Sequence, residues 1–480
     1  MDECLSHEIL GRIIDLATVS SRGTLDGKDI PALSSCMLVS RRWREVMLHS
    51  AFLWTYLKLC IRSDATRESA AKLFEAGRVW YRRAGTAPLS LFLIANPRAT
   101  RAITPLIVEF VHELVGQWSS LRVHAPQVIA MRIFCVKDGG RASPRLVWEN
   151  TVNLNIDTLA GIKASPLRMQ PSPFDTRSGA NFPSPIPNLH TLKLSHGDFL
   201  RDLGTIAWTK LKNLELRNIK PGSHLSWHLE HLGRAADLEV FFIGFEPRPD
   251  AHSRPVADVV GEDLRRVVVL PKLKHLYIQG VRFLPRGLVL LQQLRVPVLE
   301  HLHYALGDDH LGPVNTDEGI LAVAELLNRS ACGASFKELE IQPLSSYGGV
   351  PPSSETMRAL FDATPSLTRL VFPCDTISPD IAIASLSYLP PCVRRVTIML
   401  HSPYDLLATF KSVCEFVEQR RVRRPQDSLV HVDIVVKIAS VWGALGNSME
   451  VEMRSCCRTI EGCMVESLSE RDFYSDPARC

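Results

Sequence analysis

One apolar spacing constrains the fold of this chain more than any other feature: a large residue is followed three and five positions later by two more. The spacing occurs nine times, at Leu189/Leu192/Leu194, Leu211/Leu214/Leu216, Leu238/Phe241/Ile243, Leu273/Leu276/Ile278, Leu299/Leu302/Tyr304, Phe336/Leu339/Ile341, Leu367/Leu370/Phe372, Val393/Val396/Ile398 and Leu429/Val432/Ile434. Its last two positions alternate with other residues, as in a strand that buries one face. The chain is therefore predicted to form a series of short strands.

Helical patterns lie between these predicted strands, for instance at residues 320–327, 357–361 and 406–417. One strand and one helix per unit resembles a leucine-rich repeat, in which each unit buries its apolar face by stacking on its neighbours. Regular repeats carry asparagine or cysteine three residues after the last leucine, whereas this chain has Gly197 and Ile219 at such positions. We therefore expect an irregular α/β solenoid. A doubly wound α/β domain is the alternative, because it shows the same alternation.

The N-terminal residues predict a small all-helical unit. Leu5, Ile9, Ile13 and Leu16 recur at helical spacing, and Glu8 falls in the first turn, where the helix dipole favours an anion. A second helix is predicted after a loop, with Asp29 as its cap and an apolar face that runs on to Trp43. Three short helices in about 60 residues cannot bury all their apolar side chains. Part of this surface is expected to meet a partner or the next domain.

Three ordered blocks in this region resemble the F-box, particularly that of the large fungal, mushroom-type families. The blocks are Leu5/Glu8/Ile9/Leu10, Val39/Ser40/Arg41/Trp43/Arg44 and Phe52/Leu53/Trp54. Ser6 stands where the family usually has proline, and a serine can cap the helix that proline would have started. The resemblance implies docking on a Skp-type adaptor subunit and, through it, on a cullin. The residues expected to contribute are Leu5, Glu8, Ile9, Leu10, Ile13, Val39, Trp43, Leu53 and Trp54.

These patterns divide the chain into four predicted parts. Residues 1–60 form the F-box, and residues 61–145 form a helical linker with the first irregular repeats. Residues 146–440 form the leucine-rich-repeat-like solenoid, and residues 441–480 form a C-terminal cap or tail.

Composition limits the function. The 480 residues are 46% hydrophobic and 22% charged, which is typical of a globular chain with two or more cores. The charge of +4, from 55 basic and 51 acidic residues, gives no electrostatic case for nucleic acid. Twelve cysteines without a CxxC pair fit a reducing compartment. The acidic first residues and the absence of a long apolar stretch predict neither a secretory signal nor a membrane span. We expect a cytoplasmic or nuclear location, or both.

The candidate catalytic and metal motifs are weak. Residues 23–28 look like a phosphate loop but are one residue short and follow no strand. His224, His228 and His231 have helical spacing, yet the neighbouring leucines favour an exposed polar side of a repeat helix over a zinc site. The cluster of Cys456, Cys457 and Cys463 has no nearby fourth ligand. No catalytic residue, cofactor or metal is predicted.

The sequence thus predicts a non-enzymatic substrate adaptor of an SCF-type (Skp, cullin, F-box) ubiquitin ligase, in the ubiquitin conjugation pathway. The repeat strands or their loops would bind a protein substrate, which the sequence does not identify. Two alternatives stay open. One is a repeat scaffold whose N-terminal helices merely cap the solenoid, without ligase assembly. The other is a hydrolase in the α/β part, although no nucleophile-elbow motif is present.

Overall fold

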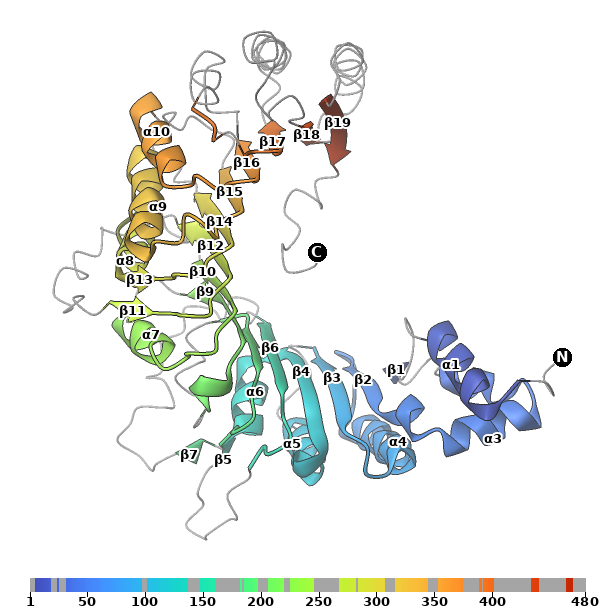
Figure 1. The fold of residues 1–480 in the computed structure, drawn as a ribbon. Coiled ribbons are helices and arrows are strands. Elements are labelled where there is room, and N and C mark those ends of the chain that lie inside the picture. The colour runs from blue at the N-terminus through green and yellow to red at the C-terminus, as the bar shows by residue number, and fades with distance from the viewer. Residues whose placement is uncertain are drawn as a thin grey trace. The chain divides into compact units, whose positions relative to one another are not determined.

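The computed structural model describes residues 5–18, 24–25, 32–96, 102–136, 147–159, 182–183, 185–196, 206–219, 225–245, 267–281, 284–306, 316–343, 353–373, 388–390, 392–400, 433–439 and 463–468. The chain divides into two compact units, Met1–Arg217 and Asn218–Cys480, whose elements are labelled in Figure 1. No helix in the described ranges is long and apolar enough to cross a membrane.

The N-terminal part of the first unit is helical. Its elements are α1 (His7–Thr18), the short strand β1 (Thr24–Leu25), α2 (Ala32–Cys36), α3 (Arg41–His49) and the 3-10 turn η2 (Ala51–Trp54). The hydroxyl of Ser6 accepts the Ile9 N–H at 3.3 Å, so the predicted capping role of this serine is confirmed. The Ser40 hydroxyl likewise accepts the Trp43 N–H and begins α3. The prediction of one continuous second helix was wrong, because this cap separates α2 from α3. Its predicted cap Asp29 lies outside the described residues.

The rest of the first unit alternates strands and helices. Its main elements are β2 (Tyr56–Ile61), α4 (Arg67–Ala84), β3 (Leu89–Ala95), α5 (Thr104–Glu113), η3 (Val115–Gln117), β4 (Trp118–Pro126), α6 (Gln127–Phe134), β6 (Asn153–Leu159), β8 (Thr191–Leu194), η5 (Trp208–Lys210) and β9 (Asn213–Ile219). The strands pair in the order β1-β2-β3-β4-β6-β8-β9, all parallel. A small antiparallel pair joins β5 (Cys135–Val136) to β7 (Phe182–Pro183). Helices α4, α5 and α6 lie along one face of these strands (Figure 1).

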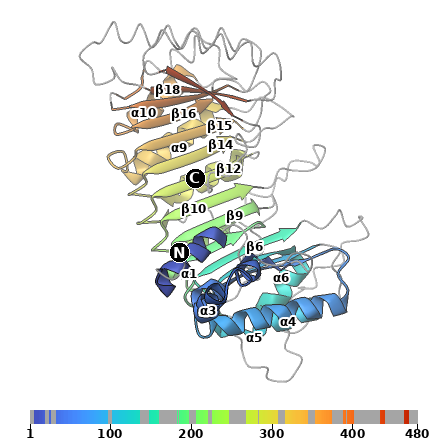
Figure 2. The same ribbon diagram turned by 90° about the vertical axis from the view of Figure 1, so that its right-hand side faces the viewer.

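The second unit continues the alternation. Its elements are α7 (Leu225–Leu232), β10 (Val240–Phe245), β11 (Val268–Val269), β12 (His275–Val281), α8 (Leu284–Gln293), β13 (Leu294–Arg295), β14 (His301–Leu306), α9 (Thr316–Ser330), β15 (Glu338–Pro343), α10 (Ser354–Asp362), β16 (Arg369–Pro373), β17 (Arg395–Leu400), β18 (Asp433–Ala439) and β19 (Cys463–Leu468). The main strands are parallel and pair in chain order from β10 to β19. Figure 2 shows them side by side, with α9 and α10 behind.

The core follows the repeated apolar spacing. In the second unit Leu276, Leu302 and Leu339 are partners in register on β12, β14 and β15, and each is at most 1% exposed. The last residue of every predicted strand match lies on a strand, so the α/β class with parallel strands is confirmed. Leu429 and Val432 of the ninth match lie outside the described residues. The strand order within each unit does not reverse, unlike the order in a doubly wound sheet. That alternative therefore does not fit the strands that the structure describes.

Two further copies of the spacing occur in the first unit, in addition to the nine predicted from the sequence. They are Trp54/Leu57/Leu59 and Trp118/Leu121/Val123, and all six side chains are at most 1% exposed. A tryptophan occupies the first position in both copies, whereas a leucine, phenylalanine or valine occupies it in the predicted set. The strand pattern therefore begins within the stretch that resembles the F-box.

Candidate protein-interaction surfaces

Helix α1 has one buried and one exposed apolar side. Leu10 and Ile14 are at most 1% exposed and pack into the first unit, whereas Ile9 is 51%, Ile13 40% and Leu16 76% exposed. The exposed three are spaced four and three residues apart, which places them on one face of a helix. Solvent exposure of three large aliphatic side chains on one helix face marks a candidate contact surface.

Exposed apolar side chains are concentrated in this part of the chain. Across the residues the structure describes, fourteen large hydrophobic side chains are exposed, and seven of them lie between residues 9 and 52. We call these seven the N-terminal apolar set: Ile9, Ile13, Leu16, Leu38, Val39, Leu48 and Phe52. Single exposed hydrophobic side chains are ordinary on a protein surface. A concentration of half of the exposed large hydrophobic side chains in so short a segment is unusual.

The nine residues predicted to contact an adaptor fall into three groups. Ile9, Ile13, Val39 and Glu8 are exposed, Leu5 and Trp43 are half-buried, and Leu10, Leu53 and Trp54 are buried. Only side chains of the first two groups are accessible to a partner in this conformation. The three buried residues act in the fold of the chain itself.

Trp54 connects the N-terminal helices to α4. Its indole N–H donates to the Met47 carbonyl at the end of α3, at 2.7 Å. Its ring meets the Trp80 ring edge-on, with centroids 4.7 Å apart, and the Arg83 guanidinium lies 4.4 Å from the ring centroid. Every part of the side chain thus has an internal partner, which accounts for its complete burial.

Helix α1 is joined to the following elements by a few specific contacts. The Arg42 guanidinium on α3 donates to the Leu5 carbonyl. The ring of Phe52 lies against Gly11 of α1, and the Arg12 guanidinium is 5.6 Å from the centroid of that ring. Phe52 is nevertheless 40% exposed, so it bridges the internal packing and the N-terminal apolar set.

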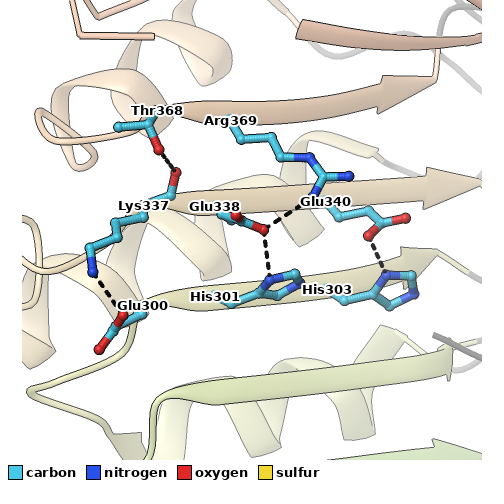
Figure 3. A network of polar contacts seen from close by, with 8 residues as sticks. All are labelled: Glu300, His301, His303, Lys337, Glu338, Glu340, Thr368 and Arg369. Carbon is cyan, nitrogen blue, oxygen red and sulfur yellow. Dashed lines mark hydrogen bonds and ion pairs between the residues drawn. The ribbon is translucent and has the colours of Figure 1, made fainter. Parts of the chain in front are cut away.

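The second candidate surface is the strand face of the second unit opposite its helices. Because the strands are parallel and in register, His301, Glu338 and Arg369 form one row across β14, β15 and β16. His301 Nδ1 is 3.1 Å and Arg369 Nη1 is 3.3 Å from the same oxygen, Oε2 of Glu338 (Figure 3). In the next row, His303 Nδ1 lies 3.3 Å from Glu340 Oε2, an ion-pair distance without hydrogen-bond geometry.

Aromatic rings adjoin these charged rows. The Tyr277 ring centroid on β12 lies 5.3 Å from that of His301 and 6.0 Å from that of His303. Burial lowers the pKa of His301, and the nearby carboxylates of Glu338 and Glu340 oppose that shift. This face is therefore rich in polar groups, and Glu338 is the common partner of His301 and Arg369.

None of the described residues forms a cluster of histidine, cysteine, aspartate or glutamate that could hold a metal. His224, Cys456 and Cys457 lie outside the described residues. His228 is 1% exposed, so the prediction of an exposed polar helix side was wrong at this position. Leu229 and Leu232 of the same helix are buried with it, and the helix contacts β11.

No protein-family model and no curated protein matches this sequence. The resemblance to F-box proteins therefore rests on the three residue blocks between Leu5 and Trp54. The two candidate surfaces rest on the exposure, register and contacts described above.

Proposed function

We propose that this protein is the substrate adaptor of an SCF-type ubiquitin ligase. In this proposal the N-terminal helices dock on a Skp-type adaptor subunit, which links the protein to a cullin. The observation that carries the proposal is the N-terminal apolar set, because half of the exposed large hydrophobics among the described residues coincide with the stretch that resembles an F-box. Burying such side chains is what stabilises the centre of a protein interface.

The same proposal interprets the remaining strands and helices as an irregular leucine-rich-repeat-like solenoid. Its support is the chain-order pairing of parallel strands within each unit, together with helices on one face of them. That arrangement leaves the opposite strand face available for a protein substrate. The proposal keeps the four parts predicted from the sequence. Residues 1–60 dock on the adaptor subunit, and the strands that follow bind the substrate.

The proposed mechanism is proximity without chemistry by this chain. The bound substrate would be held near the ubiquitin-charged enzyme at a high effective concentration. No catalytic residue, metal or cofactor of this protein takes part in the proposal. The proposed location is the cytoplasm, the nucleus or both, where ubiquitin conjugation operates.

A repeat scaffold without ligase assembly is the second candidate. It is favoured by the burial of Leu10, Leu53 and Trp54, since these residues of the resemblance also serve the chain's own packing. The two candidates differ over Ile9, Ile13 and Val39. A scaffold needs none of these exposed side chains, whereas an adaptor-docking surface needs most of them.

The test is titration calorimetry of the purified full chain with a Skp-type adaptor subunit. The variant Ile9→Ala/Ile13→Ala/Val39→Ala removes side chains that are 51%, 40% and 61% exposed. The control Val267→Ala/Leu321→Ala/Val128→Ala removes side chains of matched exposure, 53%, 40% and 59%, from outside the set. We expect the first variant to bind about 30-fold more weakly or worse, about 2 kcal/mol, and the control to bind normally.

Absence of binding by the intact chain would favour the scaffold. Equal losses in the two variants would also contradict docking through the N-terminal apolar set. Circular dichroism melts of both variants establish that they are folded.

A further inference from the structure

A row of three side chains on the first unit combines two cations with one aromatic ring. Lys58, Phe92 and Arg122 are partners in register on the neighbouring strands β2, β3 and β4. The Lys58 Nζ lies 5.5 Å and the Arg122 Cζ 4.4 Å from the centroid of the Phe92 ring. The ring is thus flanked by two cations, on the strand face opposite helices α4 and α5.

Neither cation has a carboxylate partner in the part of the chain that the structure describes. Two other groups on the same face have carboxylate partners: His124 Nδ1 is 2.7 Å from Asp157 Oδ2, and Lys193 Nζ is 2.9 Å from Glu215 Oε2. A cation beside an aromatic ring is stabilised weakly compared with one that also meets an anion. Lys58 and Arg122 therefore retain the capacity to bind anions.

A third cation lies close in the sequence. Arg62 directly follows β2, and its Nη1 atom is buried without a hydrogen-bond partner among the described residues. An unsatisfied guanidinium nitrogen is costly when buried. Arg62 therefore adds a further cation near Lys58 in the sequence.

We propose that the row Lys58, Phe92 and Arg122 binds an acidic, extended peptide segment of a protein partner. Two strand spacings separate β2 from β4, about 9.6 Å. A polyproline II segment advances about 9.3 Å in three residues and returns to the same side. Two acidic residues with two residues between them would thus reach both cations, and the residues between would cover Phe92. This inference rests on the proposed function, for which it names the substrate class.

The test uses a dansyl-labelled, proline-rich peptide whose only charged side chains are two glutamates three positions apart. Its binding to the full chain is followed by fluorescence anisotropy at two salt concentrations. We expect binding about tenfold tighter or more than that of the peptide with two glutamines, and weaker binding at high salt. Spacing the glutamates by two positions is expected to reduce the affinity.

The variant Lys58→Gln/Arg122→Gln is expected to lose this glutamate-dependent binding. The control Lys72→Gln/Arg82→Gln removes the same charge from α4, where both side chains are more than 70% exposed. Equal affinity for the glutamate and glutamine peptides, absence of binding, or an equal loss in the control would overturn the proposal. Melting curves show whether each variant is folded.

Adaptor binding by the same variants separates this inference from the proposed function. We expect Lys58→Gln/Arg122→Gln to bind the Skp-type adaptor as the intact chain does. Peptide binding without adaptor binding would support the anion site and contradict the proposed role in a ubiquitin ligase. Adaptor binding without peptide binding would reject the anion site alone.

Discussion

Residues 41–61 and 104–126 are built alike but covered differently. Each runs from a helix through a 3-10 turn into a parallel strand, as α3-η2-β2 and α5-η3-β4. Trp54 and Trp118 donate their indole N–H groups to the carbonyl seven residues earlier, at 2.7 Å and 2.8 Å. Both rings also meet an aromatic ring of α4 edge-on. The two tryptophans therefore have the same role of fixing a helix end to the strand that follows.

The two regions differ in how far their helices and 3-10 turns are covered by other parts of the chain. Helix α5 packs between α4 and α6, and no large hydrophobic side chain from residue 104 to 126 is exposed. In the first region, by contrast, Leu48 and Phe52 are 41% and 40% exposed. The shared construction thus accounts for Trp54 but not for these exposed residues. Burial separates the side chains that build the fold from those available to a partner.

The largest expected effect on stability comes from removing either of the two tryptophans that fix a helix end to the following strand. Trp54→Ala and Trp118→Ala each remove a fully buried indole, so each should lower the free energy of unfolding by about 3–5 kcal/mol. Urea unfolding followed by circular dichroism measures both. If Trp54→Ala were to abolish adaptor binding while leaving stability intact, Trp54 would be a docking residue and the comparison would fail.

The next effect compares the packing of two helix glycines. A Cβ at Gly77 on α4 would lie 3.1 Å from the Phe110 ring of α5, so Gly77→Ala should destabilise by about 1–3 kcal/mol. A Cβ at Gly11 on α1 would lie 3.4 Å from the Phe52 ring. Gly11→Ala should be neutral or stabilising by up to about 1 kcal/mol, because alanine favours the helix. Thermal melts of the two variants should shift in opposite directions, or only the Gly77 variant should shift.

A smaller effect is expected on the pH dependence of stability, through a histidine on helix α5. Burial lowers the pKa of His112 on α5 below its ordinary value of 6.5, and its Nε2–H donates to the Ile133 carbonyl at 2.7 Å. The unfolded chain therefore binds this proton more readily than the folded chain. Stability from this group is present above pH 6.5 and declines as the pH falls below it. In melts from pH 7.5 to pH 5.5, His112→Gln should show a shallower decline than the intact protein.

The smallest effect on stability is expected on the exposed face of α1. Ile9→Ala should change the free energy of unfolding by less than about 0.5–1 kcal/mol, because the side chain is half in solvent already. The same variant should weaken adaptor binding in calorimetry. Strong destabilisation by Ile9→Ala would place this residue with Trp54, not with the N-terminal apolar set.

The sequence predicted the strands because their apolar spacing survives irregular intervals, as at Leu276 and Leu302. The nine predicted copies did not include those that begin at Trp54 and Trp118, and Trp54 had been interpreted as part of the F-box-like blocks. The site was predicted only in part. Helical spacing showed that α1 has an apolar side, but it did not show that Leu10 faces inward while Ile9 faces outward. That distinction depends on the packing of α1 on α2, α3 and the Phe52 ring, which no local pattern encodes.

Within each unit the main strands pair with the next main strand along the chain. Contacts between strands consequently close short loops, and folding rates rise as the sequence separation of contacting residues falls. A nascent chain could therefore add one strand and helix at a time onto those already formed, without waiting for its C-terminal end. Pulse-labelling hydrogen exchange during refolding would reveal such an order as protection that spreads from neighbouring strand to neighbouring strand.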